Sequence, residues 1–102
     1  MKRKTDDTEK WSHKHNYPVE EVWNTYHTLS QIIETRLQAF KALDKHGYPP
    51  DFDDMRKWNK TIQMMADAFE LLKYAASYTE DERRRIEQGL DLFRKYYCYL
   101  RD

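Results

Sequence analysis

The chain has 102 residues, and its 18 basic side chains balance 18 acidic ones, so no net charge favours nucleic acid or an anionic membrane. Only two glycines and three prolines occur, whereas a turn-rich β protein needs breaks about every 8 to 12 residues. A chain this short builds one modest core without a deep cleft between lobes, which disfavours an enzyme for large substrates. We therefore expect a single all-α domain.

The N-terminal segment differs in composition from the rest. Residues 1–16 are polar apart from Trp11, so they bury too little surface to offset the entropy of ordering them. We predict a flexible polar tail over 1–16 and a helical domain over 17–102. The sequence holds no run of about 18 apolar residues and no apolar signal-peptide region, so we expect a cytoplasmic protein without membrane contact.

The first predicted helix begins at Pro18, because proline suits a first helical turn and Glu20 and Glu21 place negative charge at the positive end of the dipole. It extends to His46-Gly47, and its apolar side chains recur at spacings of three and four. These side chains are Val22, Tyr26, Leu29, Ile33, Phe40 and Leu43, with Arg36 in one apolar slot. We expect this stripe to face the core.

The second helix follows the turn Gly47-Tyr48-Pro49-Pro50, and Asp51 or Asp53 is predicted to cap it. Its main stripe is Met55, Trp58, Ile62, Met65, Phe69, Leu72 and Ala76. A second seam comprises Met64, Ala68, Leu71, Ala75 and Tyr78. Because the two seams lie on different sides, this helix is predicted to be central and to contact two partners.

The third helix opens with Thr79-Glu80-Asp81-Glu82, which has the form of a capping box. Its stripe is Ile86, Leu90, Phe93, Tyr97 and Leu100. Gly89 lowers helix stability and indicates close approach of another backbone, from the first helix or from the third helix of a second chain. The short connections predict an antiparallel three-helix bundle.

Several short stretches occur in a distinctive order. They are Trp23-Asn24-Thr25-Tyr26, Arg36-Leu37 with Phe40-Lys41, Gly47-Tyr48-Pro49, Trp58 with Met65 and Ala68-Phe69-Glu70, and Glu87-Gln88-Gly89-Leu90-Asp91-Leu92-Phe93. In order and spacing they resemble an uncharacterised family of small helical proteins encoded by bacteriophages and prophages. The resemblance implies a phage origin and action inside a bacterial host, and it brings no activity, ligand or catalytic residue.

Patterns for metal binding and nucleophilic catalysis are missing from the sequence. His13 and His15 are two imidazoles in a polar tail, and two ligands do not make a metal site. Cys98 is the sole cysteine, with no histidine near it in the sequence, and is expected to be a packed or half-exposed thiol. We expect no metal, no cofactor and no enzymatic activity.

Arginines and aromatic rings carry the binding hypotheses. Arg36 needs a carboxylate, a head extended into solvent, or a bound anion such as phosphate. Its candidate carboxylates are Glu70, Asp67 and Asp91. Arg83-Arg84-Arg85 forms either a solvated, salt-bridged face or a partial phosphate contact. The aromatic residues at or beyond the edges of the stripes are Trp23, Tyr48, Phe52, Tyr74, Tyr96 and Tyr99.

We therefore expect a non-enzymatic binding protein, a homo-oligomer, that engages a host protein or a small anionic ligand and antagonises host defence. The candidate binding residues are Arg36, Arg83, Arg84, Tyr96 and Tyr99. One alternative is a sponge for a nucleotide second messenger, with arginines on phosphates and rings on bases. Another is a DNA- or RNA-binding accessory protein, which the zero net charge disfavours.

Overall fold

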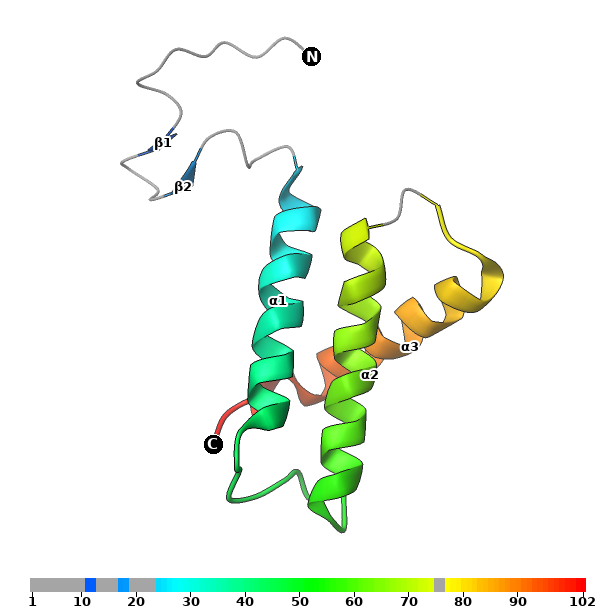
Figure 1. Cartoon of the computed structure of the whole chain (residues 1–102). Coiled ribbons are helices and arrows are strands. Elements are labelled where there is room, and N and C mark those ends of the chain that lie inside the picture. Colours follow the sequence, from blue (N-terminus) through cyan, green and yellow to red (C-terminus); the bar gives the residue numbers. More distant parts are fainter. Residues whose placement is uncertain (1–10, 13–16, 19–23, 75–76) are drawn as a thin grey trace, which may run out of the picture.

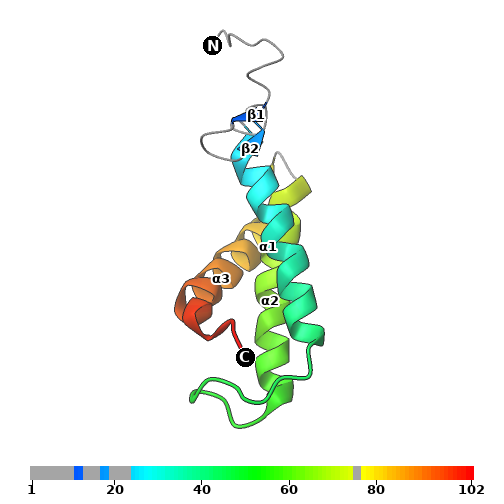
Figure 2. The same cartoon turned by 90° about the vertical axis from the view of Figure 1, so that its left-hand side faces the viewer.

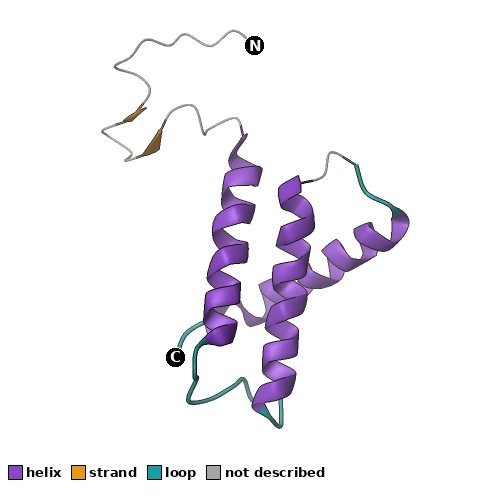
Figure 3. Cartoon of the chain, viewed as in Figure 1, coloured by secondary structure: helices purple, strands orange, loops and turns teal. Residues whose placement is uncertain are grey.

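The structure is a computed structural model, and it describes residues 11–12, 17–18, 24–74 and 77–102. Its helices are α1 (Thr25–Ala42), α2 (Met55–Tyr74) and α3 (Glu80–Tyr96), which the short 3-10 helix η3 (Tyr97–Tyr99) extends. Figure 1 shows α1 and α2 side by side and antiparallel, and α3 crossing α2 obliquely. The side view in Figure 2 and the secondary-structure colouring of Figure 3 show the same arrangement. The expected all-α three-helix bundle is confirmed.

The chain before α1 departs from the prediction. Trp11–Ser12 (β1) and Tyr17–Pro18 (β2) pair as two short antiparallel strands, in the register Trp11↔Pro18 and Ser12↔Tyr17. The prediction that Pro18 opens the first helix was wrong, because the fixed φ of proline is as compatible with a strand as with a first helical turn. The predictions for residues 1–10, 13–16, 19–23 and 75–76 lie outside the described residues.

The central position predicted for α2 is confirmed. This helix packs against both α1 and α3. The buried core cluster is Leu37, Trp58, Ile62, Met65, Ala66, Phe69 and Tyr96, most of which α2 provides. The cap of α2 was predicted wrongly: the N–H of Lys57 donates to Asp54 Oδ1 at 2.7 Å, so Asp54 is the capping residue. Neighbouring aspartates compete for this role, and only the one adjoining the first turn can reach it.

The start of α3 and its contact with α2 are both found where the sequence predicts them. Thr79 and Glu82 form the predicted capping box, with their side chains and backbone N–H groups bonded reciprocally. Gly89 packs directly on α2, where an added Cβ would overlap Ala68 and lie 2.8 Å from the carbonyl oxygen of Met64. The close approach predicted at Gly89 is therefore confirmed, but its partner is α2 rather than the first helix or a second chain.

Helix α1 packs on α2 through a face other than the predicted one. Its buried residues are Ser30, Glu34 and Leu37. In contrast, Leu29 and Leu43 remain about half exposed, at 50% and 49%. The expectation that the whole apolar stripe of this helix faces the core was wrong, because an ionic contact of Glu34 with α2 occupies the inward side.

The apolar stripe predicted for α3 is also rotated relative to the core. Ile86, Gly89 and Tyr96 are buried, whereas Leu90 and Tyr97 are exposed. Close approach at Gly89 requires this glycine to face α2, and a helix rotates about 100° per residue, so neighbouring Leu90 is carried outward. Apolar side chains thus remain at the surface on both α1 and α3.

Candidate functional site

The candidate site is an apolar groove between α1 and the C-terminal end of α3. Its volume is about 350 Å³. The lining residues are Ile32, Ile33, Arg36, Leu37, Phe40, Phe93, Tyr97 and Leu100. Leu37 is buried at the base, and Ile32 and Tyr97 stand at the surface with 48% and 62% of their area exposed. The groove is therefore open to a large apolar group.

The groove continues into a partly exposed surface of α1, which lies beside the side of this helix that packs on α2. We call this surface the α1 face and define it as Tyr26, Leu29, Ile33, Arg36, Phe40 and Leu43. Ile33 and Phe40 are half-buried and pack against the core cluster, whereas the other four side chains are exposed. Together with Ile32 and Tyr97 they make an apolar patch on the order of 500 Å², near the upper end for the largest patch of a monomer. Patches of this size commonly mark interaction sites.

Arg36 is the one charged residue that lines the groove. It is exposed, and within the described part of the chain it forms no ion pair. Of the carboxylates predicted as its partners, Glu70 lies 3.7 Å from Lys73 Nζ instead. The guanidinium head extends into solvent, because the rotation of α1 turns Arg36 away from α2.

The buried charge on α1 is Glu34, which the sequence analysis missed. Lys73 Nζ donates to Glu34 Oε1 at 3.1 Å, and this hydrogen bond is the main cause that raises the pKa of Lys73. At the same end of the helix pair, His27 Nδ1 lies 2.7 Å from the carbonyl oxygen of Lys73. These contacts join α1 to α2, so the role of Glu34, Lys73 and His27 is to hold the two helices together. In the sequence, the only sign of this buried charge is that Glu34 directly follows Ile33 of the apolar stripe.

Lys45 is a buried cation that caps the C-terminal end of α1. Its Nζ donates to the carbonyl oxygens of Phe40, Lys41 and Leu43 at 3.0, 3.0 and 3.1 Å. Burial lowers the pKa of Lys45. A basic residue just beyond a helix commonly caps the last carbonyls, and this signal was present in the sequence. The capping contacts hold Leu43 and Phe40 in place at one end of the α1 face.

Arg83 and Arg84 lie on the exposed side of α3, away from the groove lining. Arg84 NH2 is 3.6 Å from Asp81 Oδ1, and Arg85 Nε is 3.2 Å from Asp81 Oδ2. Arg84 also borders a charged hollow that contains both Glu87 and Arg94. These contacts favour the interpretation of a solvated, salt-bridged face.

Tyr96 is placed in the core, so the expectation that it lies outside the packed seams was wrong. Its hydroxyl donates to Asp51 Oδ2 at 2.8 Å, and its ring centroid lies 5.6 Å from that of Trp58. Burial and the bond to Asp51 raise the pKa of Tyr96. A tyrosine one position from a predicted stripe becomes buried when the helix turns by one residue.

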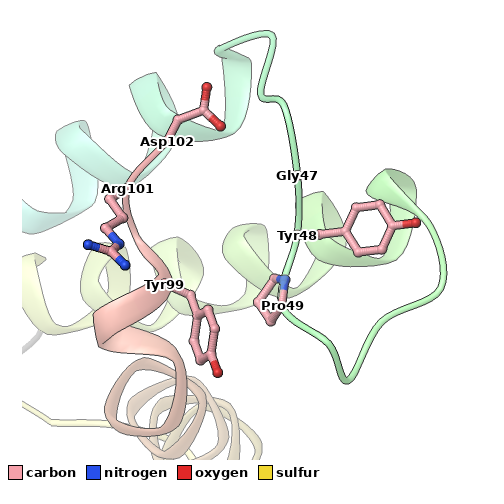
Figure 4. Close-up of a pocket in the computed structure, with 6 residues that line it drawn as sticks. All are labelled: Gly47, Tyr48, Pro49, Tyr99, Arg101 and Asp102. Carbon is pink, nitrogen blue, oxygen red and sulfur yellow. The ribbon is translucent and has the colours of Figure 1, made fainter.

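Tyr99 borders a second pocket of about 380 Å³, between the α1–α2 loop and the C-terminal segment (Figure 4). Its lining also includes Gly47, Tyr48, Pro49, Arg101 and Asp102. In Figure 4, Tyr99 lies near Pro49, whereas the Tyr48 ring and the Arg101 head point in different directions.

A carboxylate gives this second pocket a charge unsuited to phosphate. His46 donates to Asp102 through its side chain and its backbone N–H, both at 2.8 Å, and these bonds lower the pKa of the Asp102 carboxyl. The structure thus places the five predicted binding residues apart: Arg36 in the groove, Arg83 and Arg84 on α3, Tyr96 in the core and Tyr99 at this pocket.

Among the described residues, no group of three or more His, Cys, Asp or Glu side chains is arranged to hold a metal ion. Cys98 is exposed. None of the helices in the described ranges has the length and apolar character needed to cross a membrane. Comparisons of the chain with protein-family models, curated proteins and solved structures give no match. The geometry of the molecule is therefore the basis for assigning a function.

Proposed function

We propose that this chain is a small, non-enzymatic binding protein that contacts another protein chain through the α1 face and the adjoining groove. The observation that carries this proposal is the exposure of Tyr26, Leu29 and Leu43, which belong to an apolar stripe lying beside the buried side of α1. Tyr26 and Leu29 are 58% and 50% exposed although their spacing is that of a packing seam. Covering such a surface removes its apolar area from water.

The chemistry of the face favours a protein over a small ligand. Tyrosine and arginine are enriched in protein interfaces, and Tyr26, Tyr97 and Arg36 supply both here. The face extends along a regular helix, as in complexes that pair an amphipathic helix with an apolar groove. As the resemblance to phage proteins implies, we expect this binding to occur in the cytoplasm of a bacterial host.

The nucleotide-sponge alternative has less support. It needs arginines and aromatic rings around one pocket, and the pocket that contains Tyr48, Tyr99 and Arg101 also contains Asp102. A carboxylate repels phosphate. The nucleic-acid alternative would need a basic surface, whereas on α3 Asp81 forms ion pairs with both Arg84 and Arg85.

Site-specific photo-crosslinking in bacterial cells tests the proposal. A photoreactive residue at Ile32, on the rim of the groove, should give one discrete covalent adduct to a protein. The same residue at Tyr48, an exposed position in the α1–α2 loop, is the control. The adduct at Ile32 should disappear when Leu29→Glu is added. An Ile32 variant that reacts no more than the Tyr48 control contradicts the proposal.

A further inference from the structure

The α1 face has a spacing that is the same in both directions along the helix. Its residues are Tyr26, Leu29, Ile33, Arg36, Phe40 and Leu43. The steps between them are three, four, three, four and three residues. Alternating steps of three and four produce the a and d positions of paired helices. From Tyr26 to Leu43 the order of steps is unchanged on reversal, which allows this described part of the stripe to match a second, antiparallel copy of itself.

We infer that the α1 face binds the α1 face of a second copy of this chain, with the two helices antiparallel; the inference rests on the proposed function. A two-fold axis between Ile33 and Arg36 brings Leu29 opposite the partner's Phe40. The same register pairs Tyr26 with the partner's Leu43 and Ile33 with the partner's Arg36. Because this contact is isologous, it closes as a dimer and leaves no further binding face of the same kind.

The area of the face is sufficient for such a dimer. Tyr26, Leu29, Ile32, Leu43 and Tyr97 are each 48% or more exposed. Two faces on the order of 500 Å² together remove on the order of 1,000 Å² from water, which reaches the lower limit for a specific interface. The dimer is therefore of the weak class, in exchange with monomer.

The groove gives the partner helix a defined place. Phe40 and Ile33 are half-buried and line the groove beside Phe93, whose ring lies 5.4 Å from that of Tyr97. In the antiparallel register the partner's Leu29 lies against Phe40. A leucine that packs on the half-buried Phe40 ring buries apolar area on both sides.

Arg36 opposes the association and gives it a characteristic salt dependence. The two-fold axis brings the Arg36 side chains of the two copies near each other, and like charges repel. Their aliphatic stems cover the apolar surface while the charged heads extend to solvent. Added salt screens the repulsion between the heads. The dimer is thus expected to tighten as the salt concentration rises and when Arg36 is replaced by an apolar residue.

Analytical ultracentrifugation of the full chain tests the inference. We expect a monomer–dimer equilibrium whose dissociation constant falls with salt. Leu29→Glu should raise that constant at least tenfold, whereas Tyr48→Glu, which adds the same charge at a residue 43% exposed in the loop, should leave it unchanged. Arg36→Leu should lower it about tenfold. Circular dichroism of each variant verifies that the helices are retained.

Three outcomes overturn the inference. The first is a chain that stays monomeric at millimolar concentration in both low and high salt. The second is a Leu29→Glu variant that dimerises as the unaltered chain does, which would assign the contact to another face. The third is an Arg36→Leu variant whose dimer is weaker. If the chain is monomeric and the Ile32 crosslink to a different protein persists, the proposed function stands and only the second copy is excluded. If the crosslink is also lost, both are excluded.

Discussion

Helices α1 and α2 have similar lengths and similar apolar spacing, but they place their apolar side chains in opposite ways. Within α2, Trp58, Ile62 and Met65 are almost completely buried. Within α1, the buried positions include Ser30 and Glu34. Of its apolar stripe, Tyr26, Leu29 and Leu43 are exposed, and Ile33 and Phe40 are only half-buried. Apolar periodicity therefore identifies a surface that can be covered, and the structure of the whole chain decides what covers it.

The inward side of α1 is stable because its charge is paired. An isolated buried carboxylate is strongly disfavoured, and Glu34 is satisfied by Lys73 on α2 and lies near Gln38 on its own helix. This pairing fixes the rotation of α1. The apolar stripe of α1 is consequently turned away from α2 and only partly covered, and there we place the binding surface.

The largest expected effect separates the two helices directly. Trp58 packs against Phe40, Phe52 and Tyr96, so Trp58→Ala should lower the free energy of unfolding by about 3–5 kcal/mol. Leu29→Ala on the exposed face of α1 should lower it by less than about 1 kcal/mol. Urea denaturation of dilute protein measures both. Equal losses would mean that the stripe of α1 is part of the core.

The next effect concerns the side of α2 that packs against α3 through Gly89. The described part of α1 contains no glycine that could make such a contact. Gly89→Ala should destabilise the chain by about 1–3 kcal/mol through overpacking, although alanine favours a helix by nearly 1 kcal/mol. Adding Ala68→Gly should recover part of the loss, since the new Cβ would otherwise overlap Ala68. A stabilised Gly89→Ala variant would contradict the close crossing.

A smaller effect compares the first turns of the two helices. Asp54 accepts the N–H of Lys57, so Asp54→Ala should cost about 1 kcal/mol of stability. Asn24 stands at the corresponding place before α1 and makes no capping hydrogen bond through its side chain. Asn24→Ala should therefore leave the thermal midpoint nearly unchanged. If Asn24→Ala lowered the thermal midpoint more than Asp54→Ala, then α1, and not α2, would depend on its cap.

The smallest effect is a change of stability with pH on the alkaline side. The bond to Glu34 raises the pKa of Lys73 above its ordinary value of 10.5. A raised lysine pKa stabilises the folded state fully below pH 10.5 and loses that stabilisation as the pH rises through the folded value. The unfolding free energy of the unaltered chain should exceed that of Glu34→Gln at neutral pH, and the difference should shrink above pH 10.5. A constant difference would show that the pair is not ionic.

The sequence predicted those parts of the fold whose sequence patterns have only one structural explanation. The stripe of α2, the capping box at Thr79 and the close approach at Gly89 belong to this group. The rotation of α1 was not predictable, because Glu34 is buried only through Lys73, which is 39 residues away in the chain. Long-range ion pairs leave no periodic signal in a single sequence.

The candidate site shows the same division. Arg36 was identified from its place in an apolar stripe, and it lines the groove. Tyr96 was assigned to the surface because it lies beside the predicted stripe of α3, yet a turn of about one residue buries it. Tyr97 was assigned to the core because it belongs to that stripe, and it is exposed at the groove.

The most direct measurement is an isotope-filtered nuclear Overhauser experiment on a mixture of labelled and unlabelled chains. Leu29 and Phe40 are 11 residues apart on one helix, which separates them by about 16 Å and excludes a signal within one copy. We expect a cross-peak between the Leu29 methyl groups and the Phe40 ring of the second copy. Contacts of Leu29 with Trp58 or Met65 of its own chain would instead place the stripe inside the core and contradict the outward position of the α1 face.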